Sequence, residues 1–171
     1  MGQRCVIQAL LLHLAQERTY ADQPELIRRC ADIAHQFGTK QLRIFAFWPR
    51  RELVPEVETI IVDALASAVS LAHELDVDLV LENEHACIVG TGEEAARVVS
   101  TVNDDRLKIC WDPGNSFMAG EKPFPYGYEL VKPWLGHVHV KDARTLPNTN
   151  EKVWAVIGEG EIGYADQFEG L

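Results

Sequence analysis

Apolar residues along this chain alternate between short strand-like runs and longer stretches with helical spacing. The strand-like runs occupy residues 42–47, 77–81, 107–111 and 135–138. Helical spacing of apolar positions is found over residues 24–37, 55–75, 95–102, 128–131 and 165–171. Because each strand-like run is followed by a helical stretch, the sequence predicts repeated βα units and therefore a parallel sheet.

Turn and cap residues separate these elements. Thr91 and Glu94 have the spacing of a capping box, which predicts that a helix begins there. The proline and glycine residues within 113–125 predict a long irregular loop after the third strand, and long loops at that end of a sheet are often functional. The glycines within 158–163 predict a turn before the last helix.

Three strand-like runs lead directly into a residue that can bind a divalent metal. These residues are Glu82, Asp112 and His139, and the interval between one and the next is about the length of a βα unit. Parallel strands end at the same edge of their sheet, so we expect the three side chains to share one face. In a (β/α)8 barrel, that C-terminal face is the catalytic face. The sequence therefore predicts a metal site built from oxygen and nitrogen ligands.

The fold class expected from this pattern is α/β, a partial (β/α)8 TIM barrel with parallel strands. A doubly wound open sheet would also alternate strands and helices. However, no G-x-G-x-x-G follows an early strand, and polar residues at successive strand ends suit a barrel better. The chain has 171 residues, whereas a complete barrel takes about 250. We therefore expect residues 1–171 to form one incomplete barrel domain.

Composition and charge narrow the range of partners. Hydrophobic residues make up 47% of the chain and charged residues 25%, which is ordinary for a folded globular domain. The net charge is −10, and no run of Lys or Arg is longer than a pair. Proteins that bind nucleic acid normally carry a basic stripe. The charge therefore disfavours a nucleic-acid partner.

The N-terminal apolar run and the cysteines bear on location. Residues 5–15 are interrupted by Gln8 and His13 and are followed by no convincing small-residue cleavage site, so we expect core structure rather than a signal peptide. The run is also too short to cross a bilayer. The cysteines are scattered, without a C-x-x-C pair. This pattern favours buried, reduced thiols and a cytoplasmic protein without a membrane partner.

Four strings, in this order and at βα spacing, resemble the sugar phosphate isomerase/epimerase family of xylose isomerase-like TIM barrels. They are LENEH at residues 81–85, CWDPGN at 110–115, HVHVKD at 137–142 and GEGEI at 158–162. The resemblance extends from about Leu42 to the C-terminus, and the order of the four strings makes it far more specific than any one string alone.

The resemblance implies a divalent ion, usually manganese, magnesium, cobalt or zinc, held by Glu, Asp, His and a second Glu from four consecutive strands. Glu82, Asp112 and His139 match the first three ligands, and the fourth, expected on the last strand, has no counterpart in this chain. The resemblance therefore implies a barrel fragment that lacks N-terminal βα units and the last strand. The implied substrate is a sugar or sugar phosphate. Whether the full-length protein forms a homo-oligomer stays an open question. The implied reaction is isomerisation or epimerisation through proton transfer next to a carbonyl, by way of a metal-stabilised enediolate.

The resemblance also implies roles for individual residues in that reaction. Glu82 would be an acid/base catalyst as well as a ligand. His85, Asn115 and Lys141 would hold substrate oxygens. His137 shares a strand face with His139 but does not match a ligand, so a supporting role is expected.

Two alternatives to this function remain. An apurinic endonuclease of the same superfamily would need additional zinc ligands, but the corresponding positions are Asn115, Lys152 and Trp154. The other alternative is that the fragment is inactive by itself, because an open barrel exposes strand edges and the site would lack a ligand.

Overall fold

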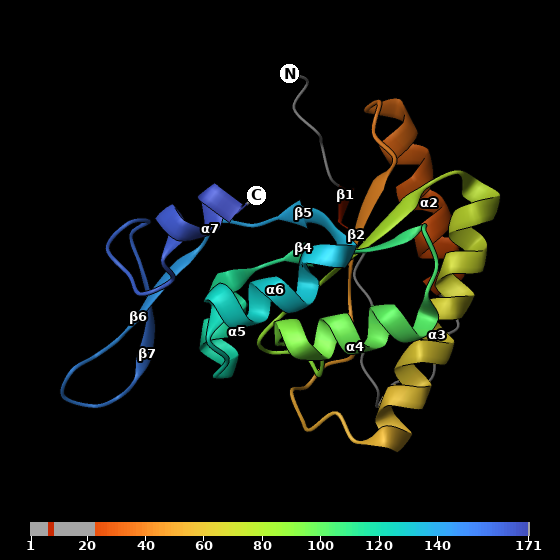
Figure 1. Cartoon of the computed structure of the whole chain (residues 1–171). Helices are drawn as coiled ribbons and strands as arrows, with labels where there is room; N and C mark the ends of the chain where they lie inside the picture. Colours follow the sequence, from red (N-terminus) through yellow and green to blue (C-terminus); the bar gives the residue numbers. More distant parts are fainter. Residues whose placement is uncertain (1–6, 9–22, 171) are drawn as a thin grey trace.

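The computed structural model describes residues 7–8 and 23–170, and its centre is a parallel sheet with the strand order β1-β2-β3-β4-β5 (Figure 1). The strands are β1 (Ile7–Gln8), β2 (Gln41–Phe45), β3 (Asp78–Glu82), β4 (Leu107–Trp111) and β5 (Leu135–Val138). Every neighbouring pair in this sheet is parallel. The predicted partial α/β barrel with adjacent parallel strands is confirmed. The N-terminal run 5–15 lies outside the described residues except for β1 and was not predicted as a strand.

The helices predicted from the apolar spacing are present in the structure. They are α2 (Gln23–Gln36), α3 (Pro55–Leu75), α4 (Gly92–Val102), α6 (Tyr128–Val131) and α7 (Tyr164–Gly170). α4 begins with the predicted capping box: the Thr91 side chain accepts a hydrogen bond from the Glu94 N–H (3.1 Å), and Glu94 Oε2 accepts one from the Thr91 N–H (3.0 Å). None of the described helices is long and apolar enough to cross a membrane.

The two faces of the sheet have different chemistry. Leu42, Ile44, Leu79, Leu81 and Ile109 are fully buried in the main apolar core together with residues of the surrounding helices. Side chains alternate between the two faces along a strand. The intervening positions therefore belong to the inner face, which corresponds to the interior of a barrel. These inner positions carry the polar residues of the chain's candidate site.

The segment after β4 corrects the prediction of a long irregular loop. Residues Pro113–Ala119 form helix α5, and Asp112 is its N-cap, accepting a hydrogen bond from the Asn115 N–H at 2.9 Å. The Pro-Gly pair that suggests a turn is also compatible with the first turn of a helix, because proline fits the N1 position. Further along, Pro123–Gly127 forms a kinked helical turn, and Lys132–Trp134 forms a short 3-10 helix.

A β-hairpin that the sequence pattern did not predict lies beyond β5. Its strands β6 (Asp142–Thr145) and β7 (Lys152–Ala155) are antiparallel, and in Figure 1 they lie at the side of the sheet away from α3. The Asp142 carboxylate accepts hydrogen bonds from the Ala143, Gly158 and Gly160 N–H groups, each at 2.9 Å. These bonds join the hairpin to the glycine-rich turn that precedes α7.

Candidate metal centre

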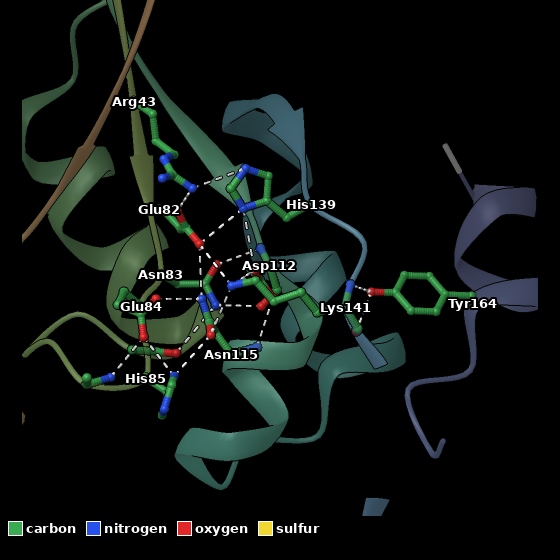
Figure 2. A network of polar contacts seen from close by, with 12 residues as sticks. Arg43, Glu82, Asn83, Glu84, His85, Asp112, Asn115, His139, Lys141 and Tyr164 are labelled. Atoms are coloured by element: carbon green, nitrogen blue, oxygen red, sulfur yellow. Dashed lines mark hydrogen bonds and ion pairs between the residues drawn. The ribbon is translucent and has the colours of Figure 1, made fainter. Parts of the chain in front are cut away.

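The three predicted metal ligands lie together at the C-terminal edge of the sheet (Figure 2). Glu82 is the last residue of β3, Asp112 follows β4 directly, and His139 follows β5 directly. The Nδ1 atom of His139 is 3.1 Å from Glu82 Oε1 and 3.4 Å from Asp112 Oδ2. Both carboxylates are fully buried and the imidazole is partly exposed, so the protein places two buried acids next to a histidine that solvent can reach.

Two cationic side chains accompany these acids. The Nζ atom of Lys141 lies 2.7 Å from Asp112 Oδ2 and 3.5 Å from Glu82 Oε1. On the other side, Arg43 Nη1 lies 2.7 Å from Glu82 Oε2. Arg43 comes from the inner face of β2 and was missed in the sequence, although it is the polar residue between the apolar Leu42 and Ile44. Each buried carboxylate is therefore contacted by a cationic side chain, and Lys141 contacts both.

Electrostatic contacts within this group shift the ionisation of its members. Hydrogen bonds to Asp112, Cys110 and Glu82 raise the pKa of His139 to about 11, although burial opposes this. Burial alone would raise the pKa of Asp112, but hydrogen bonds from His139 and Lys141 outweigh burial and lower that pKa. In the absence of a metal, the imidazole is therefore protonated and Asp112 ionised at neutral pH.

The inner face below His139 carries Cys110 and His137, which are register partners on β4 and β5. Ligand atoms of Glu82, Cys110 and His139 all lie within 4.8 Å of one another, so a thiol belongs to the same group of potential donors. Cys110 was expected only to be a buried thiol. The His137 ring is edge-on to that of His139, with centroids 5.5 Å apart, and burial lowers its pKa. His137 thus lies beside the candidate ligands.

Asn115 connects the acidic residues with the loop after β3. Its Nδ2 donates to Glu82 Oε1 at 3.1 Å and to Glu84 Oε2 at 3.3 Å. Its Oδ1 lies 3.0 Å from His85 Nδ1 and 3.4 Å from Lys141 Nζ. Asn115 is fully buried and both ends of its amide have partners, so its side chain is held in one orientation. Its hydrogen bond to Glu82 Oε1 in turn orients the Glu82 carboxylate.

His85 and Lys141, two of the residues expected to hold substrate oxygens, are partly exposed at the rim of this network. His85 Nδ1 lies 2.7 Å from Glu84 Oε1. The backbone of Lys141 is fixed by Tyr164, whose hydroxyl accepts from the Lys141 N–H (2.8 Å) and donates to the Lys141 carbonyl (2.7 Å). Nothing in the sequence pattern indicated Tyr164, which reaches the site from α7.

A buried amide aligns the ends of two ligand strands. Asn83, directly after Glu82, accepts a hydrogen bond from the Asp112 N–H and donates one to the Asp112 carbonyl, both at 2.8 Å. This pair of bonds sets the position of Asp112 relative to β3. Two independent hydrogen bonds between fully buried groups define the separation of the two carboxylates more closely than the sheet alone would.

The donor atoms fit a divalent metal. Glu82 Oε2 and Asp112 Oδ2 are buried oxygens whose short contacts are with cationic side chains, Arg43 Nη1 at 2.7 Å and Lys141 Nζ at 2.7 Å. A divalent cation could take the place of these nitrogens at the same oxygens. Two carboxylates and an imidazole are a ligand set that suits manganese, magnesium, cobalt or zinc.

Comparison with known proteins gives one family and several solved structures. The family model described as xylose isomerase-like TIM barrel matches residues 6–171. The probable 3-DHS dehydratase AsbF from Bacillus anthracis superposes with a TM-score of 0.78 at 18% identity, covering 96% of this chain and 64% of that one. A D-tagatose 3-epimerase-like protein gives 0.74 at 21% identity, with 97% and 65% covered.

A third structure was determined with a metal. The xylose isomerase-like TIM barrel protein from Mycobacterium smegmatis in complex with magnesium gives a TM-score of 0.73 at 16% identity, with 95% of this chain and 60% of that chain covered. The chain therefore spans 60–65% of the length of these three structures. No curated protein matches the sequence.

Proposed function

The chain belongs to the xylose isomerase-like TIM barrel family, and from this premise we propose that it carries the active site of a divalent-metal-dependent isomerase or epimerase for a sugar or sugar phosphate. The observation that carries the proposal is the convergence of Glu82, Asp112 and His139 at the C-terminal edge of a parallel sheet. In barrels of this kind, that edge is the catalytic face.

The proposed ligands of the ion are Glu82, Asp112 and His139. The ion, when bound, would polarise a substrate carbonyl and thereby make the proton on the neighbouring carbon more acidic. The charges of two carboxylates balance those of a divalent ion. Lys141 would then be released from Asp112 and Glu82 and could turn towards the substrate.

Glu82 is proposed as the acid/base catalyst that removes and returns this proton. Its position is defined from two sides, because Asn115 donates to Oε1 and Arg43 contacts Oε2. A carboxylate oriented in this way loses little conformational entropy when it approaches the substrate C–H bond. Such pre-orientation of the reacting groups is a large part of an enzyme's rate enhancement. Lys141 and His85, at the rim, are proposed to hold the substrate hydroxyl or carbonyl oxygens.

The nuclease alternative has weaker support. Two positions where that enzyme would need ligands, Lys152 and Trp154, lie on β7, and Lys152 Nζ donates to the Phe117 carbonyl at 2.6 Å. Neither side chain is a common zinc ligand. Together with the net charge of −10, this favours a small-molecule substrate over a nucleic acid.

The proposal can be tested by metal titration followed by isotope exchange. Calorimetry on the chelator-treated chain should detect binding of Mn²⁺, Co²⁺, Zn²⁺ or Mg²⁺ that is lost in Asp112→Asn and in His139→Gln. The metal-loaded protein, incubated with ketoses and ketose phosphates in D₂O, should then incorporate deuterium next to the carbonyl, as followed by NMR. Metal binding that both variants retain would overturn the ligand assignment.

A further inference from the structure

Trp154 of β7 lies against two residues of the candidate site. Its ring centroid is 5.6 Å from that of His85, and the two rings are nearly perpendicular at 76°. Lys141 Nζ is 5.7 Å from the indole centroid. His85 follows β3, Lys141 follows β5 and Trp154 comes from the hairpin, so three separate segments meet at this point.

The indole is firmly placed although it is 46% exposed. Trp154 pairs with Ala143 across the hairpin, next to Asp142 and its hydrogen bonds to the glycine-rich turn. At the start of α5, a Cβ on Gly114 would lie 3.1 Å from the Trp154 ring and 2.8 Å from the Lys141 carbonyl. Only glycine leaves room there for both.

At this point a half-exposed indole lies beside two polar side chains, those of Lys141 and His85. Indole offers a large, rigid apolar face with few rotamers to lose on binding. The neighbouring side chains, in contrast, offer hydrogen-bond donors, since Lys141 and His85 both carry N–H groups. An apolar wall beside a few convergent polar groups is the usual composition of a small-molecule site.

We propose that Trp154, His85 and Lys141 form a substrate subsite in which the indole packs against the C–H face of a sugar ring. The proposal rests on the proposed function, in which the open-chain carbonyl form reacts. It makes the ring form of a hexose, which has no free carbonyl, the form that binds first and then opens. Lys141 and His85 contact oxygens at the edge of the ring. Trp154 is thus a specificity-determining residue contributed by the hairpin.

The test compares ring and open-chain ligands. The Mn²⁺-loaded chain is titrated with D-fructose or D-tagatose and, separately, with dihydroxyacetone, which has the carbonyl and hydroxyl groups but no ring face. Trp154→Ala should weaken ketohexose binding about tenfold and leave dihydroxyacetone and Mn²⁺ binding unchanged. Trp154→Phe should lose less, because it keeps an aromatic face. Phe37→Ala, at a residue 70% exposed just after α2, is the matched control and should change nothing.

Saturation-transfer NMR supplies a readout independent of activity: the ring C–H protons of the ketohexose should receive the strongest saturation in the wild type and lose it in Trp154→Ala. Absence of Mn²⁺ binding would count against the proposed function alone, because the NMR comparison can also be made without metal. Equal ketohexose affinity of wild type and Trp154→Ala, no ketohexose binding by the wild type, or a parallel loss for dihydroxyacetone would overturn the Trp154 proposal.

Discussion

The ammonium nitrogen of Lys141 lies 2.7 Å from Oδ2 of Asp112, a carboxylate with no exposed surface. The same ammonium is 3.5 Å from Glu82 Oε1, so it lies between the two acids proposed to bind a metal. A cation of the protein itself therefore neutralises the carboxylates in the metal-free state. A divalent ion would have to compete with it for the same oxygens.

Lys141→Met should consequently strengthen metal binding. The substitution keeps much of the side-chain length but removes the competing charge, and unit charges a few ångströms apart near a protein surface interact by up to about 4 kcal/mol. Removing water from the ion costs free energy in both proteins, so only part of this gain should be seen. We expect the affinity for Mn²⁺ to be about tenfold higher in Lys141→Met, as measured by calorimetry.

The control for this experiment is Lys40→Met. Lys40 directly precedes β2, at the opposite edge of the sheet, and forms an exposed ion pair with Asp76. Lys40→Met changes the net charge by the same amount as Lys141→Met. An equal gain in Mn²⁺ affinity for both variants would therefore mean that the overall charge, and not the contact with Asp112, is responsible. Weaker binding by Lys141→Met would contradict the competition model.

Glu82→Gln tests the proposed acid/base role. The amide has the size of the carboxylate and keeps one oxygen that can accept from Asn115, but it cannot take up the substrate proton. At saturating Mn²⁺ we expect kcat for exchange of the substrate's α-proton with solvent to fall at least about 10²-fold. Glu129→Gln, an exposed acid on α6, is the control. Exchange at the wild-type rate in Glu82→Gln would sink the mechanism.

The protonation of His139 predicts how metal binding depends on pH. In the metal-free chain its pKa is raised to about 11, mainly by the hydrogen bond to Asp112. Because the unfolded value is about 6.5, this proton stabilises the fold fully below about pH 6.5, and the contribution is lost as pH rises towards 11. A metal at Nδ1 has to displace the proton, so affinity for Mn²⁺ should rise with pH.

Calorimetry in buffers of different ionisation enthalpy measures this proton directly. We expect release of a proton from His139 on binding near pH 7, and none from Asp112, whose lowered pKa keeps it ionised already. His139→Gln should bind weakly and without that proton. Binding without proton release in the wild type would show that His139 is neutral before the metal arrives or is not a ligand.

The elements that could be predicted are helices whose periodic apolar pattern extends over many residues, and strands that are buried apolar runs. β3 and β4 end where the sequence places them, at Glu82 and just before Asp112, because continuous apolar runs lead into a polar residue. The hairpin could not be predicted in this way. Its two strands have four residues each, and the burial of β7 does not alternate between the two faces.

Within the site, residues that follow strands could be predicted, whereas residues brought in by tertiary packing could not. Glu82, Asp112 and His139 share an edge of the sheet because parallel strands end together. Tyr164 and Trp154 reach the site from α7 and β7, and their approach depends on the hairpin's position rather than on any local pattern. Arg43 could have been found from its polar character at an inner-face position of β2.

The hairpin itself should depend on the Asp142 carboxylate. Asp142→Asn removes the charge and replaces one accepting oxygen with an NH₂ group, so bonds from the Gly158 and Gly160 N–H groups to Oδ2 are lost or weakened. Gly158 is exposed and Gly160 is partly buried, so each lost bond should cost about 1 kcal/mol. We expect faster hydrogen exchange over 142–160 and a lower midpoint in urea. Glu151→Gln changes the charge equally at an exposed position of the same hairpin and should leave both unchanged. Equal exchange rates in Asp142→Asn and wild type would show that the hairpin is fixed by other contacts.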